Sequence, residues 1–316
     1  MDILQFMKRR ADLQSLLLSA GTVTAGTAAA VVRGNMEVLA ASVCLLFALT
    51  MQLGCNLYYH YRMLSRSEVK RRHGESVSED RGPLAKRVLR EGSFACLVIS
   101  LMIGLTIMTM SADFWWTIVV GAVIYGLVYL MTIGPKIYRS PWSLLITFVV
   151  FGPIGVMATG FLQFQHEAAR SLWNSYDSYP CIFLGIAMGF LACSHHLVQS
   201  YYYYEIDDRR IWKGCVGCFG HRGVRVLVLL MGVLSLATVI WSVFSLSFPE
   251  PLIAVIPGFL GFALNTLVGF SMSRSGAGEL HHLGSLTRVN FFLTALLFFI
   301  IWWALGSPDD SMRLLF

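Results

Sequence analysis

Charged residues are scarce in this sequence. They make up 13% of its 316 residues, and apolar residues make up 56%, whereas a soluble domain carries about 25% charged residues. Several apolar runs are far longer than the core helix of a soluble protein needs to be. The composition therefore excludes a soluble globular protein and predicts an integral membrane protein surrounded by lipid.

Signals of secretion and of nucleotide binding are missing as well. The seven cysteines are an odd number and lie mostly inside apolar runs, which argues against a disulfide framework. No convincing small-residue cleavage site follows the first apolar run, so we expect that run to be a membrane span and not a signal peptide. No glycine-rich phosphate loop follows a predicted strand, and no strand-rich domain is predicted.

The sequence is dominated by long apolar runs. A window of about 20 residues finds nine candidate spans, and we expect a single polytopic domain over residues 1–316. The spans are predicted at residues 13–32, 36–60, 93–110, 115–134, 143–163, 180–200, 224–247, 252–270 and 287–305. Two long polar segments, 61–92 and 201–223, follow the second and sixth spans and are predicted to be loops.

The basic residues are distributed unevenly between the loops. With nine spans, the N-terminus and the loops after the even-numbered spans share one side, and 21 of the 24 Lys and Arg residues fall there. The positive-inside rule makes that side cytoplasmic and the C-terminus external, in a plasma membrane or cell inner membrane. The net charge of +6 is explained by this asymmetry, so we expect no nucleic-acid partner.

The second and sixth spans end in polar and aromatic residues. The second ends in a stretch that contains Gln52, Asn56 and His60, and the sixth runs into four tyrosines that begin at Tyr201. Similar ends four spans apart indicate a weak internal duplication, or one site built from two corresponding helix ends.

Three acidic residues lie within four positions directly after those tyrosines. If the helix continues, Glu205 and Asp208 lie on one face at i and i+3, and Arg209 follows at i+4. Two carboxylates in this arrangement could hold Mg²⁺ through oxygen ligands and, with it, a phosphate. The alternative, which is simpler for this stretch alone, is an interfacial belt of tyrosines followed by solvated charges.

A Cys-x-x-Cys-x-x-His run lies beside this stretch, formed by Cys215, Cys218 and His221. Structural zinc needs four ligands, and only three are local, so the fourth would have to be His73 or His281. We favour the alternative of two unpaired cysteines in a tight glycine-rich loop.

Two adjacent histidines, His195 and His196, lie inside the sixth predicted span. An intramembrane histidine is a candidate functional residue. The alternative is a pair of hydrogen bonds between helices, and we expect that role for at least one of the two.

Further short segments match a known pattern in order and spacing. They are Gly26-Thr27-Ala28, Gln52-Leu53-Gly54-Cys55-Asn56, Arg81-Gly82-Pro83 with Arg87-Val88, Gly134-Pro135, Phe151-Gly152-Pro153 with Val156, Thr159 and Gln163, and Glu279-Leu280-His281 with Thr287. Together they resemble the UbiA-type intramembrane prenyltransferases, and among these the 1,4-dihydroxy-2-naphthoate polyprenyltransferases of menaquinone synthesis. The resemblance runs nearly end to end.

The resemblance implies a fold and an activity. It implies nine transmembrane helices bundled around a central cavity that opens to the cytoplasm, capped by the segments 61–92 and 201–223. In that family two aspartate-rich motifs bind Mg²⁺ and the pyrophosphate of a polyprenyl donor, and an aromatic acceptor attacks the allylic carbon. It therefore implies a transferase whose partners are a polyprenyl pyrophosphate, an aromatic acceptor and membrane lipid.

The sequence departs from the family at the metal site. His60 and Met63 stand where the first motif has its two aspartates, and Glu205 and Arg209 stand at the aspartates of the second. Mg²⁺ needs hard oxygen ligands, and neither His60 nor Met63 supplies one. We expect at most one Mg²⁺, held weakly by Glu205 and Asp208.

The resemblance and the departures together define the candidate site. The catalytic candidates are Asn56, His60, Glu205 and Asp208, and the candidates for substrate binding are Gln52, Arg62, Tyr201, Arg209, Arg210 and Lys213. The cationic members could bind an anionic head group directly, without metal. Two alternatives remain: a catalytically silent relative that binds an isoprenoid or quinone or supports a partner enzyme, and an unrelated transporter, whose site would lie nearer the bilayer middle.

Overall fold

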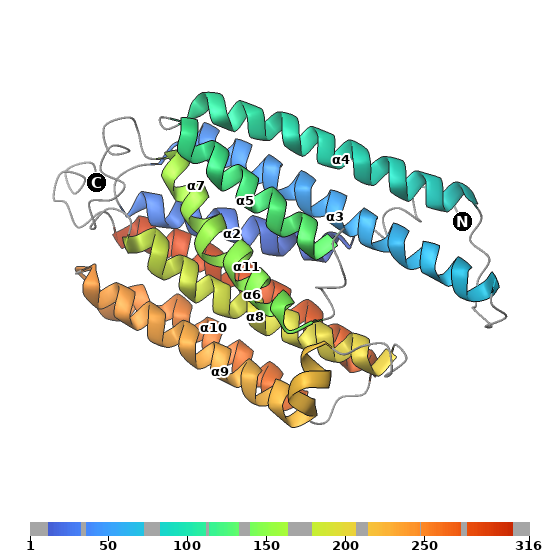
Figure 1. Cartoon of the computed structure of the whole chain (residues 1–316). Coiled ribbons are helices and arrows are strands. Elements are labelled where there is room, and N and C mark those ends of the chain that lie inside the picture. Colours follow the sequence, from blue (N-terminus) through green and yellow to red (C-terminus); the bar gives the residue numbers. More distant parts are fainter. Residues whose placement is uncertain are drawn as a thin grey trace.

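The structure, a computed structural model, describes residues 12–32, 36–72, 83–111, 114–132, 140–163, 179–206, 214–246, 248–272 and 277–305, and the regular elements in these residues are helices (Figure 1). Their bounds are η1 Leu13–Ser15, α2 Leu16–Val31, α3 Val38–Arg72, α4 Pro83–Met110, α5 Phe114–Thr132, α6 Trp142–Val149, η3 Val150–Ile154, α7 Gly155–Gln163, α8 Tyr179–Ile206, α9 Cys215–Ser245, α10 Pro251–Ser271 and α11 Ala277–Leu305. The prediction of an all-α protein is confirmed.

Seven of the helical stretches are long and apolar enough to cross a membrane. They are Val38–Arg62, Leu84–Met110, Trp142–Gln163, Tyr179–Tyr204, Cys215–Ser245, Pro251–Ser271 and Glu279–Leu305. The apolar stretch of α5, Phe114–Leu130, is shorter, and α2 has 16 residues. The prediction of a membrane protein is thus confirmed by seven helices of sufficient length.

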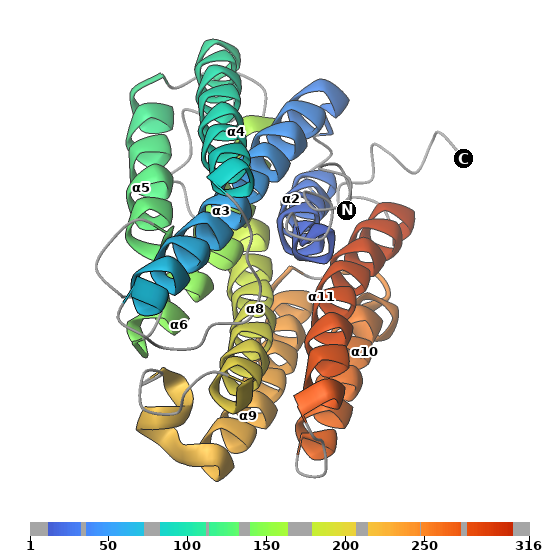
Figure 2. The same cartoon turned by 90° about the vertical axis from the view of Figure 1, so that its right-hand side faces the viewer.

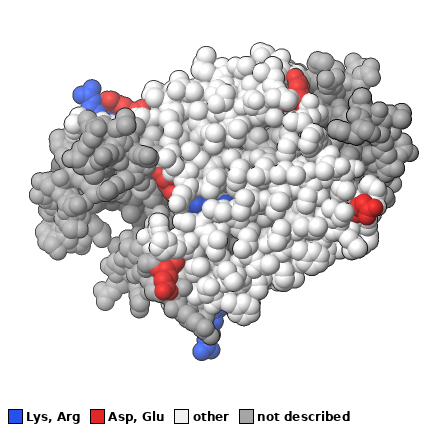
Figure 3. Space-filling model, turned by 180° about the vertical axis from the view of Figure 1, so that it is seen from behind, with Lys and Arg blue, Asp and Glu red and all other residues white. Residues whose placement is uncertain are grey.

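The outer surface of the bundle is suited to lipid. Phe94, Trp115 and Leu252 are 71%, 75% and 83% exposed, and Figure 3 shows a broad surface with very few charged side chains. Exposed apolar area on this scale would be unfavourable in water and is favourable against lipid tails.

Helix α8 forms the centre of the bundle. Its apolar stretch is 72% buried, against 17% for that of α4. α9, α11, α6 and α2 pack around it, while α3 and α4 form a separate antiparallel pair. Figure 2 shows α3, α4 and α5 grouped on one side and α8 to α11 on the other, with α2 between the two groups.

Small residues let α2 approach its neighbours closely. A Cβ atom added to Gly26 would lie 2.6 Å from the Cβ of Thr159 in α7 and 2.7 Å from the carbonyl oxygen of Val156. Side chains larger than hydrogen are therefore excluded there, and close packing replaces the hydrophobic effect as the main attraction between helices in lipid.

The fifth predicted span is a broken helix. A π-helical turn, η3, separates α6 from α7, and inside it Gly152 has φ −108° and ψ −112°. Pro153 lacks a backbone N–H and cannot continue the hydrogen-bond ladder, which is a common cause of kinks. A Cβ atom on Gly152 would lie 2.6 Å from both the Gly185 carbonyl oxygen and Gly189 Cα, so the break also brings this helix against α8.

Some helices extend beyond the predicted spans. α3 continues to Arg72 and α4 begins at Pro83, so both ends of the predicted loop 61–92 are helical. α9 begins at Cys215, with a kink at Gly220, where φ is +69°. The run that contains Cys215 and Cys218 is therefore the first turn of a helix and not the glycine-rich loop that was predicted.

Candidate functional site

A pocket of about 680 Å³ lies between the two groups of helices. Its walls come from α2, α3, α4, α5, α8 and the broken helix α6–α7. The second and sixth predicted spans, which correspond to α3 and α8, thus line the same pocket. This volume lies within the range of small-molecule sites, about 300–1,000 Å³.

One end of the pocket is polar. α3 contributes Gln52, Asn56 and His60, and α8 contributes Gln199 and Tyr203. The two helix ends approach each other through aromatic rings, because the ring centroids of Tyr59 and Tyr203 are 6.4 Å apart. The polar helix ends singled out in the sequence therefore meet, as far as the described residues extend.

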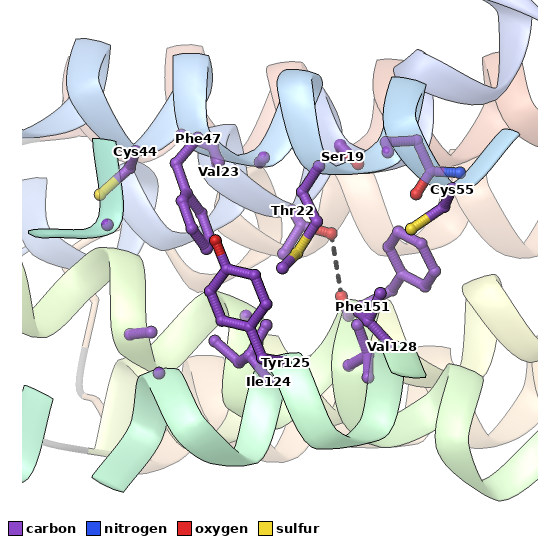
Figure 4. Close-up of a pocket in the computed structure, with 18 of the residues that line it drawn as sticks. Ser19, Thr22, Val23, Cys44, Phe47, Cys55, Ile124, Tyr125, Val128 and Phe151 are labelled. Atoms are coloured by element: carbon purple, nitrogen blue, oxygen red, sulfur yellow. Dashed lines mark hydrogen bonds between the residues drawn. The ribbon is translucent and has the colours of Figure 1, made fainter. Parts of the chain in front are cut away.

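The rest of the pocket is mostly apolar. Its lining on α3 runs from His60 back to Cys44, which is roughly 24 Å at 1.5 Å per residue. In Figure 4, Phe47 of α3 and Tyr125 of α5 point toward one another across the pocket, with ring centroids 6.0 Å apart. The pocket therefore combines a polar end with a long apolar arm.

The broken helix supplies part of the wall between these two regions. Phe151 lines the pocket, and its carbonyl oxygen accepts a hydrogen bond of 3.1 Å from the Thr22 hydroxyl of α2 (Figure 4). In lipid an unsatisfied carbonyl is costly, so this bond stabilises the break in the helix.

Asn56 is held in place by hydrogen bonds at the polar end. Its Nδ2 donates to Ser15 Oγ at 2.6 Å, and its Oδ1 accepts from Gln52 Nε2 at 3.4 Å. Ser15 Oγ donates in turn to the Asp12 carbonyl oxygen at 2.8 Å. These contacts fix the start of α2 against α3 and give Asn56 a positioning role.

A partly buried charge pair, which the sequence did not predict, lies at the polar end. Arg288 of α11 is 8% exposed, and its Nη1 donates to Asp12 Oδ1 at 2.7 Å. Asp12 is the only acid among the pocket-lining residues that the structure describes. The position of Arg288 inside the last predicted span could have revealed the pair, since a cation there requires a partner.

His195 of α8 connects this pair to the centre of the bundle. Thr287 Oγ1 donates to the Gly284 carbonyl oxygen at 2.8 Å, so it accepts from His195 Nδ1 at 2.9 Å. His195 Nε2 then accepts from Arg288 Nε at 3.4 Å. Both ring nitrogens are used between helices, which confirms the structural role expected for at least one of the two histidines.

His196, by contrast, lines the pocket. Its Nε2 lies 2.7 Å from Ser143 Oγ on α6. The adjacent histidines of α8 therefore have different surroundings, one inside the protein and one at the pocket wall.

Several predicted site residues lie elsewhere or outside the described residues. Tyr201 does not line the pocket, since its ring packs against His221 with centroids 5.0 Å apart. Arg62 lies beyond the lining of α3. Outside the description lie the side chains of Met63 and Glu205, and all of Asp208, Arg209, Arg210 and Lys213.

The predicted zinc ligands are not arranged as a metal site. Cys215 is buried and Cys218 is exposed, and His221 contacts the rings of Tyr201 and Tyr204. Within the described ranges no group of three or more His, Cys, Asp and Glu side chains could hold a metal ion. His73 lies outside those ranges.

The donors described at the polar end do not fit Mg²⁺. The carboxylate of Asp12 is paired with Arg288, and the amides of Gln52 and Asn56 are bonded to each other. A Mg²⁺ site needs several oxygen ligands in near-octahedral geometry. A site on Glu205 and Asp208 stays a prediction, because neither side chain is among those described.

Comparison of the chain with models of protein families and with curated proteins finds no match. The resemblance to the UbiA-type prenyltransferases therefore rests on the segments quoted above.

Proposed function

We propose that the protein is a membrane-embedded prenyltransferase of the UbiA type, which transfers a polyprenyl group from its pyrophosphate to an aromatic acceptor in quinone synthesis. The observation that carries the proposal is the two-part pocket, with the polar ends of α3 and α8 at one end and an apolar arm of roughly 24 Å along α3. A polyprenyl pyrophosphate has the same two parts: an anionic head and a long hydrocarbon tail.

The proposal includes nine membrane spans with a cytoplasmic N-terminus. α2 and α5 are the two short members: α2 lies between longer helices, and α5 lies at the edge of the bundle beside α4. An arrangement of nine spans collects 21 of the 24 basic residues on one side. That side is also the polar end of the pocket, so a water-soluble head group would enter from the cytoplasm.

The charge at the polar end suits an anionic head group. Pairing with Arg288 neutralises Asp12, which removes the repulsion that a free carboxylate would exert. Arg62, Arg209, Arg210 and Lys213 follow the two polar helix ends in the sequence, and we assign to them the binding of pyrophosphate oxygens. As the C1–O bond breaks, positive charge develops on the allylic carbon, and we assign its stabilisation to the rings of Tyr59 and Tyr203.

Turnover by the purified protein tests this proposal. It is incubated with a polyprenyl pyrophosphate and 1,4-dihydroxy-2-naphthoate, and the prenylated product is measured by mass spectrometry with Mg²⁺ and with a chelator. We expect slow transfer with an altered metal requirement, because losing one electrostatic stabiliser typically costs about 10²–10³ in rate. Fast Mg²⁺-dependent turnover that survives replacement of both Glu205 and Asp208 by alanine would refute the assigned site.

A silent isoprenoid-binding relative is the second candidate. The polar end favours this candidate. Asp12 is the one carboxylate among the described lining residues, and its ion pair with Arg288 leaves it unable to bind a metal ion for catalysis. Binding of a polyprenyl pyrophosphate without turnover, abolished by Arg209→Ala, would select this candidate over the enzyme.

A further inference from the structure

One face of α8 carries three polar residues into the pocket. His196, Ser200 and Tyr203 all line it, and their spacing at i, i+4 and i+7 places them on one side of the helix. His196 lies roughly 10 Å deeper along the axis than Tyr203, at 1.5 Å per residue. It is thus separated from the head-group end by about the length of a two-ring aromatic molecule.

Hydrogen bonds on α6 determine which nitrogen of His196 carries the proton. Ser143 Oγ donates its only proton to the Ser140 carbonyl oxygen at 2.7 Å. It must therefore accept the 2.7 Å bond from His196 Nε2. The neutral ring then carries its proton on Nε2, and Nδ1 is a hydrogen-bond acceptor.

Nδ1 of His196 has no hydrogen-bond partner among the described residues. His196 thus has one nitrogen oriented by Ser143 and the other available to a ligand. A base oriented in this way by a second group is a recurring catalytic arrangement.

We infer that His196 Nδ1 accepts the proton of a ring hydroxyl on the aromatic acceptor. The inference rests on the proposed function and adds to it the residue that binds the acceptor's hydroxyl and takes its proton. A ring that lacks a hydroxyl would leave Nδ1 without a partner in a low-dielectric pocket, which is unfavourable.

The transfer step balances with His196 as the base. The hydroxyl O–H bond breaks and its proton moves to Nδ1. The electron pair released on the oxygen passes through the ring, and the adjacent ring carbon forms a C–C bond with the allylic carbon of the donor. The C1–O bond of the donor breaks, and its electron pair leaves with pyrophosphate. The imidazolium keeps its Nε2 bond to Ser143. The ring carbon then loses its proton, or its carboxylate as CO₂; the electron pair of that bond restores the aromatic ring, and the ring oxygen regains a proton from Nδ1.

Binding measurements test the hydrogen bond without requiring turnover. 1,4-Dihydroxy-2-naphthoate and its dimethyl ether are titrated into the wild-type protein and His196→Gln in detergent. The introduced glutamine keeps an amide N–H for Ser143, but it has a flexible carbonyl oxygen in place of the acceptor Nδ1 that the ring holds fixed. We expect the dihydroxy compound to bind roughly tenfold more weakly to the variant, with the ether unaffected. Equal loss for both compounds, or no loss for either, would overturn the inference.

Kinetics separate a base from a structural contact. In His196→Gln we expect kcat to fall about 100-fold, with KM for the polyprenyl pyrophosphate unchanged and with partial recovery on acceptors whose hydroxyl is more acidic. Ser235→Ala is the matched control, since it removes a different hydrogen bond to α8, from Ser235 Oγ to the Ala187 carbonyl oxygen at 3.0 Å. If kcat falls no further in His196→Gln than in Ser235→Ala, or if its fall does not depend on the acidity of the acceptor's hydroxyl, His196 is not the base.

If the wild type proves unable to transfer a prenyl group, the proposed function fails, and the binding comparison alone decides whether His196 binds a ring hydroxyl.

Discussion

At the scale of single residues, the polar end is organised by groups that the sequence did not all reveal. Gln52, Asn56 and His60 were predicted and line the pocket. The pair of Asp12 and Arg288 was not, because its members are 276 positions apart and no local pattern connects them. Likewise, the repeated histidines of α8 gave no indication of which one faces the pocket.

The charge pair gives the first prediction. Asp12→Ala leaves the guanidinium of Arg288 buried without its carboxylate. Such a loss costs about 3–5 kcal/mol in a fully buried pair, and the Asp12 side chain is 33% exposed, so we expect about 2 kcal/mol. A thermal-unfolding assay in detergent should show a lower Tm.

Its control is the double variant that also carries Arg288→Gln. Removing both charges should recover part of the lost Tm. A double variant that is as unstable as the sum of the two single variants would contradict the pairing.

At the scale of helices, the apolar runs predicted the elements well and their irregularities poorly. Helices cover all nine predicted spans within the described residues, because the requirement for internal hydrogen bonds in lipid leaves few alternatives. The break at Gly152 and Pro153 was visible as a Gly-Pro pair, but its π-helical form depends on contact with α8. The extensions of α3 and α9 lie in polar sequence, where hydropathy does not detect helices.

The break in α6–α7 gives the second prediction. Gly152→Ala would place a methyl group 2.6 Å from backbone atoms of both Gly185 and Gly189, so α8 would have to move away. We expect a loss of about 1–3 kcal/mol, as for other overpacked cores, seen as a lower Tm. Because α8 carries part of the site, ligand binding should weaken too.

Gly126→Ala in α5 is the matched control. A Cβ atom there meets nothing within 4 Å, and alanine favours helix by about 1 kcal/mol over glycine. The Tm of this variant should stay the same or rise. If both substitutions change Tm equally, the close contact of Gly152 with α8 does not exclude a side chain.

At the scale of the whole molecule, the proposed topology depends on charge as well as on hydropathy. Reporter tags inserted within 73–82 and 207–213 should be cytoplasmic, and a tag at the C-terminus should be external. The reason is the excess of Lys and Arg on one side, 21 of 24. Accessibility of the tags to a membrane-impermeant reagent in intact cells measures this, and an external signal from either internal tag would refute the nine-span arrangement.

The central claim is that the two-part pocket holds an isoprenoid pyrophosphate, and photo-crosslinking tests it most directly. A polyprenyl pyrophosphate with a photoreactive group near the end of its tail is irradiated with the purified protein, and labelled peptides are identified by mass spectrometry. We predict labelling of the apolar arm, at residues such as Phe47, Met108 and Trp116, that unlabelled donor suppresses. Labelling confined to outward-facing residues such as Trp115 and Phe270, or unaffected by competitor, would contradict the account.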